Sequence, residues 1–212
     1  EKILDISKKL NIDFICASAN DFSQLTSAYV ANNLNLPGYD SINTNKIIHH
    51  KDKFKSFCEM NNFPVAKQYN ENDIKNISKS NFPIISKPTD LTGGKGISIS
   101  TNIDELKKSV SNAREISRSK NVIIEQFIQG TNHAMFSIIK NRNVIFSFFD
   151  NEHYYINNFL VSGASSYSSV GKNIQDKIIS DINRMASDLA LVDGILHLQF
   201  KFNGSEYFFL EI

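Results

Sequence analysis

The stretch Phe82–Ser98 reads FPIISKPTDLTGGKGIS. An apolar segment that ends at Lys87 is followed by a glycine-rich loop and then by a second apolar segment. Because glycine lacks a Cβ atom, the loop Gly93–Gly96 can adopt positive φ and let backbone N–H groups approach an anion closely. This order of strand, lysine, glycine loop and strand predicts a flap over the phosphates of a nucleotide, with Lys95 as a positive charge at its tip.

The loop differs from two common nucleotide-binding motifs. A P-loop needs Ser or Thr after its lysine and a helix after the loop, but Gly96–Ser100 has the pattern of a strand. The sequence also lacks a GxGxxG fingerprint between a strand and a helix. On its own, a TGGKG turn between two strands is also typical of an ordinary hairpin. The neighbouring motifs must therefore decide between the two interpretations.

The composition is that of a globular protein. The 212 residues are 41% hydrophobic and 21% charged, with a net charge of +1, and they are enough for one domain with a mobile lobe or for two small domains. The absence of a block of like charges predicts that neither nucleic acid nor a membrane is a partner. Cys16 and Cys58 form no CxxC pair, and no apolar run reaches 18 residues, which predicts a cytoplasmic protein with reduced thiols.

The first third of the chain combines helices with short apolar segments. Apolar residues recur at helical spacing, and Pro37–Gly38 marks a break. This part is predicted to begin with half of an α/β unit. Its expected elements are a helix at Lys2–Leu10, a buried strand at Asp13–Ala17, a helix at Asp21–Leu34 capped by Asn20 or Asp21, a helix at Asn45–Asn62 and a strand that starts at Val65–Tyr69.

The remainder alternates short strands with helices, which predicts two α+β lobes joined by a strand-to-strand hinge at Phe127–Gly130. Asp150–Asn151 has the composition of a turn, and Asn203–Gly204 is a strong signal for a β-hairpin. Strands are expected at Pro83–Lys87, Gly96–Ser100, Val122–Gln126, Asn132–Ile139, Val144–Phe149, Tyr154–Val161, Ile195–Phe202 and Glu206–Ile212, and helices at Asp73–Ser78, Asn102–Ser117 and Asn173–Leu191.

Several motifs follow one another in a characteristic order. The strand that ends at Lys87 and the glycine flap precede a helix and a strand that leads into Glu125–Ile128, EQFI. The final hairpin then carries Gln199 and Glu211, twelve residues apart. Together these motifs resemble the ATP-grasp superfamily. The resemblance covers residues 41–212 and is to the branch that contains phosphoribosylglycinamide synthetase, the carbamoyl phosphate synthetase large chain, biotin carboxylase and the carnosine-synthase-like amino-acid ligases.

The resemblance implies an ATP-grasp fold of the α+β class, in which two lobes with antiparallel sheets hold a nucleotide between them. Residues 1–40 are expected to be the C-terminal part of an α/β domain that precedes the grasp, and residues 41–212 the ATP-grasp domain itself. In that domain, residues 66–126 would form a small lid lobe, and residues 41–65 together with 127–212 a core lobe.

The resemblance also implies roles for individual residues. Lys87 corresponds to the strand lysine that contacts ATP, and Thr92–Gly96 to the flap over its phosphates. Lys51 is selected as a second ATP lysine because it lies thirteen residues before the proline that closes its helix, while Lys53 and Lys55 remain alternatives. The residues expected to bind the nucleotide are Lys51, Lys87, Thr92, Gly93, Gly94, Lys95, Gly96, Glu125, Gln126, Phe127, Ile128, Asn132 and His133, of which Lys51 and Lys87 would also be catalytic.

The adenosine contacts follow from the same correspondence. Glu125 and the backbone of Ile128 occupy the positions that hold adenine in the family. The ribose contact falls on Asn132 or His133. Many members carry an acid where this chain has Asn132, so His133 is the preferred candidate, and a partly exposed histidine with a structural role is the alternative.

Two further residues correspond to the family's ligands for Mg²⁺, which Mn²⁺ could replace. Glu211 matches the principal carboxylate. Gln199 stands where most members carry Glu or Asp, although carbamoyl phosphate synthetase has a glutamine there, and its amide oxygen can still coordinate. An asparagine and an arginine that usually follow Glu211 would lie beyond residue 212. The resemblance thus predicts a domain truncated at its C-terminus, weak in magnesium binding and inactive on its own.

These correspondences imply an ATP- and Mg²⁺-dependent ligase that activates a carboxylate as an acylphosphate for attack by an amine. Its expected partners are small-molecule carboxylate and amine substrates, and the resemblance also allows a homodimer. One alternative is a biotin carboxylase or carbamoyl phosphate synthetase-like module. The other is a non-catalytic ATP-binding domain, which the amides Asn132 and Gln199 would suit.

The final hairpin must meet a geometric condition. Side chains alternate along strands, so a two-residue Asn203–Gly204 turn would place Gln199 and Glu211 on opposite faces. A shared metal site therefore requires a three-residue loop at Asn203–Ser205 with positive φ near its glycine, or an equivalent bulge. With the three-residue loop, His197 would lie opposite Glu211, and Gln199 would be one diagonal step away.

Overall fold

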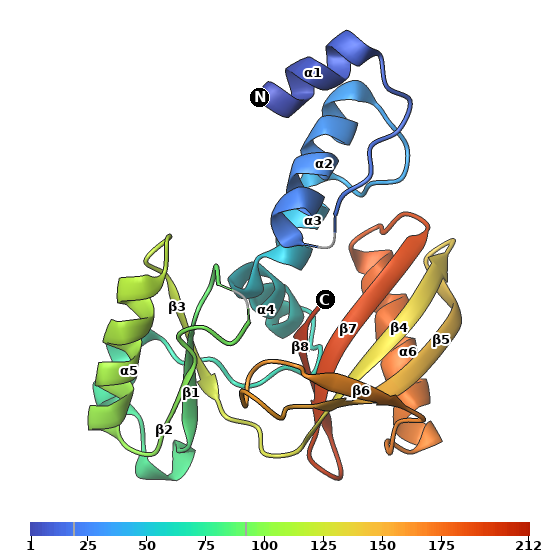
Figure 1. The fold of residues 1–212 in the computed structure, drawn as a ribbon. Helices are drawn as coiled ribbons and strands as arrows, with labels where there is room; N and C mark the ends of the chain where they lie inside the picture. The colour runs from blue at the N-terminus through green and yellow to red at the C-terminus, as the bar shows by residue number, and fades with distance from the viewer. Residues whose placement is uncertain (19, 92) are drawn as a thin grey trace.

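The computed structural model describes residues 1–18, 20–91 and 93–212. Two antiparallel sheets lie side by side, with helix α4 (Lys51–Met60) between them and the N-terminal helices beyond α4 (Figure 1). Within these residues the smaller sheet has strands in the order β2-β1-β3, and the larger sheet has the order β6-β5-β4-β7-β8. Helices and antiparallel strands therefore form an α+β fold, which confirms the predicted fold class.

The smaller sheet packs against helix α5 (Ile103–Ile116). Leu106 and Val110 lie four positions apart on α5, and both are buried in one cluster with Ile84 and Ile124 of the sheet. This cluster anchors α5 to the sheet, because apolar surface buried on both elements is removed from water. The elements of this part are the 3₁₀ helices η1 (Glu71–Asn76) and η2 (Lys79–Asn81), in place of the predicted helix at Asp73–Ser78, and the strands β1 (Ile84–Pro88), β2 (Ser98–Ser100) and β3 (Val122–Gln126).

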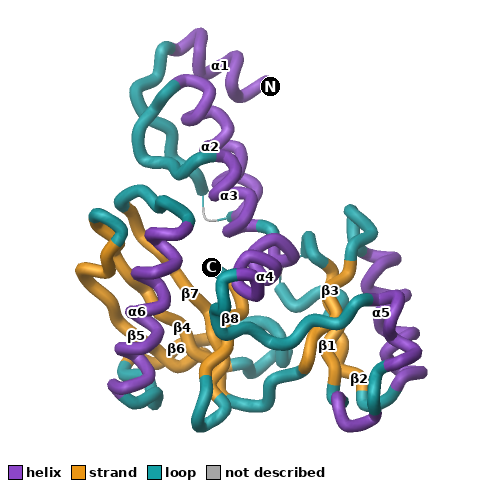
Figure 2. The backbone as a smooth tube through the Cα atoms, turned by 180° about the vertical axis from the view of Figure 1, so that it is seen from behind, coloured by secondary structure: helices purple, strands orange, loops and turns teal. Residues whose placement is uncertain are grey.

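The larger sheet is covered on one face by helix α6 (Lys172–Asp188), which Figure 2 shows from behind. Ile174, Ile178 and Ile182 recur every four positions on α6 and are buried in the main core. Phe57 of α4 joins the same core, so α4 is anchored to the larger sheet. The strands of this sheet are β4 (Thr131–Lys140), β5 (Asn143–His153), β6 (Gly163–Ser166), β7 (Gly194–Phe202) and β8 (Tyr207–Glu211).

The N-terminal part forms the predicted helices α1 (Lys2–Leu10) and α2 (Asp21–Leu34). Asn20 caps α2, because its side chain accepts a hydrogen bond from the third residue of the helix. The predicted buried strand at Asp13–Ala17 is wrong. This segment pairs with no strand among the described residues, and Phe14 is 70% exposed, so neither a hydrogen-bonded ladder nor burial supports a strand. No helix in the described part of the chain is long and apolar enough to cross a bilayer.

The single helix predicted at Asn45–Asn62 is divided into α3 (Ile42–His49) and α4. The division occurs at His50, whose backbone is extended, with φ −103° and ψ 111°. Helical spacing of apolar residues is preserved across the break, so the pattern alone did not reveal it. The segment Val65–Tyr69, predicted as a strand, makes only single bridges to β8 and β3 among the described residues.

Strand β5 continues through the predicted turn at Asp150–Asn151. Pairing with β4 overrides the turn propensity of these residues: Asp150 lies opposite Ala134, and its carboxylate accepts a hydrogen bond from the Ala134 N–H at 3.1 Å. The strand predicted at Tyr154–Val161 is wrong. That segment is largely a loop, and the next strand, β6, pairs with the end of β5.

The loop of the final hairpin has four residues, Asn203–Glu206, rather than three. Gly204 has the expected positive φ, +100°. A four-residue loop alone would leave Gln199 and Glu211 on opposite faces, but a register shift next to Gln199 inserts one extra residue in β8. Gln199 therefore lies directly opposite Glu211. The predicted equivalent bulge is confirmed, whereas the prediction that His197 lies opposite Glu211 is wrong.

Candidate functional site

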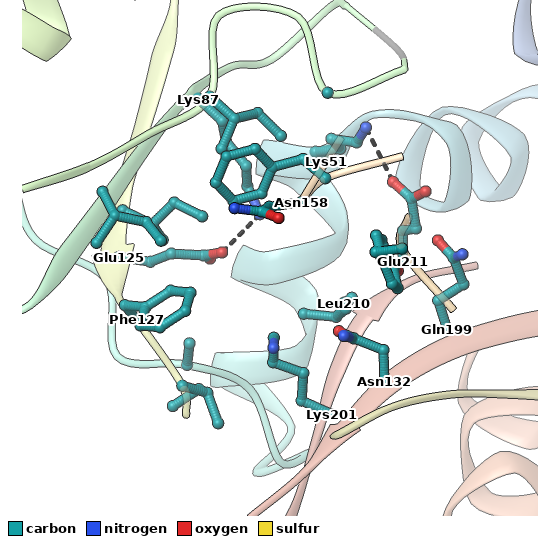
Figure 3. A pocket seen from close by; sticks show the side chains of 18 of the residues that line it. Lys51, Lys87, Glu125, Phe127, Asn132, Asn158, Gln199, Lys201, Leu210 and Glu211 are labelled. Carbon is teal, nitrogen blue, oxygen red and sulfur yellow. Dashed lines mark hydrogen bonds and ion pairs between the residues drawn. The ribbon is translucent and has the colours of Figure 1, made fainter. Parts of the chain in front are cut away.

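A cavity of about 360 Å³ lies between the two sheets. One wall comes from β1, β3 and the glycine loop, the other from β4, β7 and β8, and α4 contributes from between them (Figure 3). Segments far apart in the sequence thus contribute to one site. The predicted site residues that line this cavity are Lys51, Lys87, Gly93, Gly94, Glu125, Gln126, Phe127, Ile128, Asn132, Gln199 and Glu211.

A buried carboxylate with two lysines joins α4 to the smaller sheet. The Nζ atom of Lys87 lies 2.5 Å from Oε1 of Glu125, and the Nζ atom of Lys55 lies 3.4 Å from Oε2. The Lys55 ammonium also donates to the backbone carbonyl of Phe209 at 2.9 Å. The Lys55 side chain is fully buried, and that of Glu125 is 3% exposed. Ion pairs and a hydrogen bond therefore link α4 to strands of both sheets, in addition to the apolar contacts.

The charges of this cluster perturb one another strongly. Burial alone would raise the pKa of Glu125, but the ammonium groups of Lys55 and Lys87 outweigh it and hold the pKa at about 2. Burial, together with the like charge of Lys87, lowers the pKa of Lys55 against the attraction of Glu125. Two ammonium groups share one carboxylate, so the cluster carries an excess positive charge. Lys87 brings that charge to the cavity wall, where an anion would be stabilised.

The structure separates the three lysines of α4 that the sequence left as alternatives. Lys51 lines the cavity, and its Nζ atom lies 2.9 Å from Oε2 of Glu211. Lys55 is buried behind Glu125 and does not line the cavity, and Lys53 is exposed. Lys53 points to another side of the helix, whereas Lys51 and Lys55 are four positions apart and share a face. The displacement of one turn along α4 places Lys51 at the cavity and Lys55 behind Glu125. Lys51 is the one placed to contact a ligand there.

The predicted metal ligands lie at one end of the cavity. Gln199 and Glu211 are paired across β7 and β8, and the Gln199 amide also donates to Oε1 of Glu152 at 2.5 Å. Burial raises the pKa of Glu152. Within residues 1–18, 20–91 and 93–212, no three His, Cys, Asp or Glu side chains cluster as metal ligands. One carboxylate and one amide oxygen nevertheless suit Mg²⁺, which prefers oxygen donors and keeps waters and phosphates as its other ligands.

The segment that links β3 to β4, together with β4, forms the other end of the cavity. Phe127 lies beneath the Lys201 ammonium, whose Nζ atom is 5.4 Å from the ring centroid, and Asn132 lines the same wall. The preference for His133 over Asn132 is wrong. Successive side chains on β4 point to opposite faces, so His133 is fully buried on the α6 side, where its ring stacks on Phe200. His133 therefore packs as a structural residue, but it is fully buried and not partly exposed.

The glycine loop reaches across to the larger sheet's loop after β5. Gly93 and Gly94 line the cavity together with Phe159. Gly96 instead packs beside the smaller sheet, since a Cβ atom there would overlap Ile116 Cδ1. Lys95 is exposed and does not line the cavity, and Thr92 lies outside the described residues. Only part of the predicted flap therefore faces the cavity.

We expect Gly94→Ala to displace the glycine loop, and Gly93→Ala to do so far less. The two glycines have nearly equal φ, +73° and +68°, so both variants carry the same backbone strain. At Gly94 a Cβ atom would lie 2.8 Å from Phe159 Cβ, whereas at Gly93 it would meet nothing within 4 Å. Overpacking of this kind costs about 1–3 kcal/mol. Hydrogen exchange of the loop amides should be faster in Gly94→Ala than in Gly93→Ala. Equal exchange would show that the contact does not hold the loop.

Sequence reasoning missed several residues of the site. Lys201 could have been found, because it lies two positions after Gln199 and so shares its face of β7. Glu152 was not recognised as a site residue, because a turn was predicted at Asp150–Asn151, just before it. Asn158 and Phe159 belong to a loop whose position depends on tertiary contacts, so no local signal identifies them.

Comparison with known proteins gives the family. Residues 49–212 match the family model of the carbamoyl-phosphate synthase L chain, ATP binding domain. The carbamoyl phosphate synthase large chain of Helicobacter pylori is 26% identical over 137 residues, which are 62% of this chain and 12% of that protein. The chain therefore spans only a small part of this curated relative.

Two solved structures share the fold. The L-amino acid ligase from Bacillus licheniformis has a TM-score of 0.77 at 18% identity, over 99% of this chain and 51% of that one. The biotin carboxylase domain of the Hydrogenobacter thermophilus 2-oxoglutarate carboxylase has a TM-score of 0.83 at 15% identity, over 99% and 49%. With three quarters of its residues inside the matched range 49–212, this chain belongs to the carbamoyl-phosphate synthase L chain ATP-binding domain family, within the ATP-grasp superfamily.

Proposed function

We propose that this chain binds ATP with Mg²⁺ and uses it to activate a carboxylate as an acylphosphate, which an amine then attacks. One observation carries the proposal: a single cavity brings the positive charges of Lys51 and Lys87 together with the oxygen donors of Gln199 and Glu211. Positive charge and metal-binding oxygens in one site are what phosphoryl transfer needs, because that chemistry depends on positioning and on charge neutralisation.

The residues of the cavity divide into three groups by their proposed roles. Lys87 and the loop around Gly93–Gly94 bind the phosphates, and Lys51 neutralises charge near the transferred phosphoryl group. Glu125–Ile128 holds adenine, with Asn132 on the ribose side. Gln199 and Glu211 would hold Mg²⁺, which supplies further charge neutralisation on the phosphates when bound.

In the proposed reaction a carboxylate oxygen attacks the γ-phosphorus of ATP and ADP leaves. The amine nitrogen then attacks the acylphosphate carbonyl, inorganic phosphate leaves and the nitrogen loses its proton. Residues 66–126 would act as a lid that excludes water from the acylphosphate. The names of the relatives support a ligase: one is an L-amino acid ligase, and the structure of the biotin carboxylase domain contains MgADP and bicarbonate.

The test is ADP release from ATP and Mg²⁺ by the full-length protein, measured against pools of amino acids, other small carboxylic acids and bicarbonate. We expect release that requires one acid pool together with an amine, and loss of that release in Lys51→Met, because this lysine is half-buried at the cavity wall and pairs only with Glu211 among the described residues. Release with bicarbonate alone would favour a carboxylase or carbamoyl phosphate synthetase-like module. Tight ATP binding without any ADP release would favour a non-catalytic ATP-binding domain.

A further inference from the structure

Glu152 bridges a proposed metal ligand and a tyrosine. Nε2 of Gln199 donates to Oε1 of Glu152 at 2.5 Å, and the Tyr154 hydroxyl donates to Oε2 at 2.9 Å. Glu152 is 9% exposed. Both carboxylate oxygens therefore act as acceptors in a largely buried site, where a hydrogen bond to a charged group is strong.

This arrangement determines which way the Gln199 amide points. The Gln199 amide presents its NH₂ group to Glu152, because Nε2 donates to a carboxylate oxygen, which accepts. The amide oxygen then lies on the other side. In Figure 3 that oxygen is on the Glu211 side of the amide, and Glu211 is the cross-strand partner of Gln199. No described residue donates a hydrogen bond to this oxygen, so it remains free for a ligand in the cavity.

We propose that Glu152 is a positioning residue that fixes the Gln199 amide with its oxygen toward Glu211, so that Gln199 can bind a divalent cation. The inference rests on the proposed function, in which Gln199 and Glu211 hold Mg²⁺. A carboxylate ligand at position 199 would need no such partner, because its two oxygens are equivalent. An amide does need one, since its other half carries N–H groups that cannot coordinate a cation.

The test is a double-mutant cycle on Mn²⁺ binding. Glu152→Gln keeps the shape of the side chain, but its amide can donate or accept, so both orientations of the Gln199 amide become accessible. In the presence of ADP, we expect Glu152→Gln to weaken Mn²⁺ binding about tenfold, as for other residues that orient metal ligands. In a Gln199→Ala background, the same substitution should change the affinity less than about twofold, because the residue it acts through is gone. Electron paramagnetic resonance of free Mn²⁺ measures both, and binding of ADP without metal should stay unchanged.

The outcomes separate the possible failures. If Glu152→Gln weakens Mn²⁺ binding equally in both backgrounds, Glu152 acts through its charge and the positioning role is overturned. If Gln199→Ala leaves Mn²⁺ binding unchanged, Gln199 is not a ligand, and that part of the proposed function is overturned as well. Tyr154→Phe is a second, milder variant: it removes only the hydroxyl that holds Glu152, and should weaken Mn²⁺ binding less than Glu152→Gln does. No effect of Tyr154→Phe or of Glu152→Gln would also overturn the proposal.

Discussion

Replacing Glu125 with glutamine should lower the free energy of unfolding by about 3–5 kcal/mol, the usual cost of removing one partner from a buried ion pair. The substitution keeps the size of the side chain but leaves the Lys55 ammonium, which is fully buried, without a counter-ion. Lys87 would then repel Lys55 across the same site. Chemical denaturation of the purified chain measures the difference.

A matched control separates the effect of burying the ion pair from the effect of losing an ion pair at the surface. Glu211→Gln also removes one carboxylate from a lysine, but the side chain of Glu211 is 42% exposed, so the loss should stay below about 1 kcal/mol. The triple variant Lys55→Met, Lys87→Met and Glu125→Leu should recover most of the stability, because replacing all three charged groups by apolar ones avoids an uncompensated buried charge. Equal losses in Glu125→Gln and Glu211→Gln would contradict this account.

The loss of stability in Glu125→Gln should depend on pH, because the Glu125 carboxylate must be ionised to pair with the lysines. The pKa of Glu125 is about 2, well below its ordinary value of 4.5, so its contribution is complete above about pH 4.5 and is lost as the pH falls toward 2. A shift of this size corresponds to about 3 kcal/mol. The difference in stability between the wild-type chain and Glu125→Gln should therefore shrink across that acidic range and remain constant at neutral pH.

Replacing Lys87 with alanine should weaken the binding of magnesium nucleotide about ten- to a hundredfold. A charge-assisted contact to phosphate contributes about 1.5–3 kcal/mol, and Lys87 is the lysine that carries the excess charge of the Glu125 cluster to the cavity. Isothermal titration calorimetry with MgADP and with a non-hydrolysable ATP analogue measures the change. Because Glu125 keeps Lys55 as a partner in this variant, the fold should be retained.

Lys95→Ala is the control for this prediction. Lys95 lies on the same glycine loop, but it is exposed and does not line the cavity, so its loss should weaken binding less than about fivefold. A folded Lys87→Ala variant with unchanged affinity would exclude Lys87 as a phosphate ligand. A larger effect of Lys95 than of Lys87 would show instead that the loop tip turns inward when nucleotide binds.

The sequence by itself determined most of the local elements and their order. Amphipathic periodicity placed α1, α5 and α6, because the spacing of apolar residues reflects the face that each helix buries. The order of Lys87, the glycine loop, Glu125–Ile128 and the final hairpin indicated the ATP-grasp superfamily, which the family match confirmed. The order of motifs is a property of the sequence, so it identifies the family without knowledge of the tertiary contacts.

Only the tertiary structure decided which of the neighbouring candidates face the cavity. Asn132 and His133 differ by one position, and the phase of β4 against its partner strands turns one toward the cavity and the other toward α6. Lys51 and Lys55 share a face of α4 one turn apart. Only the packing of α4 between the sheets places Lys51 at the cavity and Lys55 behind Glu125. The sequence predicts that successive side chains of a strand point to opposite faces. Which of the two sets faces the cavity depends on the neighbouring elements.

The sequence predicted a three-residue loop or a bulge in the final hairpin, but only the assembled sheet decided between them and brought Glu152 to Gln199. The extra residue in β8 that aligns Gln199 with Glu211 depends on the pairing of β7 with β8, and Glu152 approaches Gln199 only because β5, β4 and β7 lie in one sheet. Residues so far apart along the chain come into contact only when all the strands of the larger sheet have paired. The sequence pattern therefore specified most of the elements and the family, while the assembled sheets specified which side chains meet.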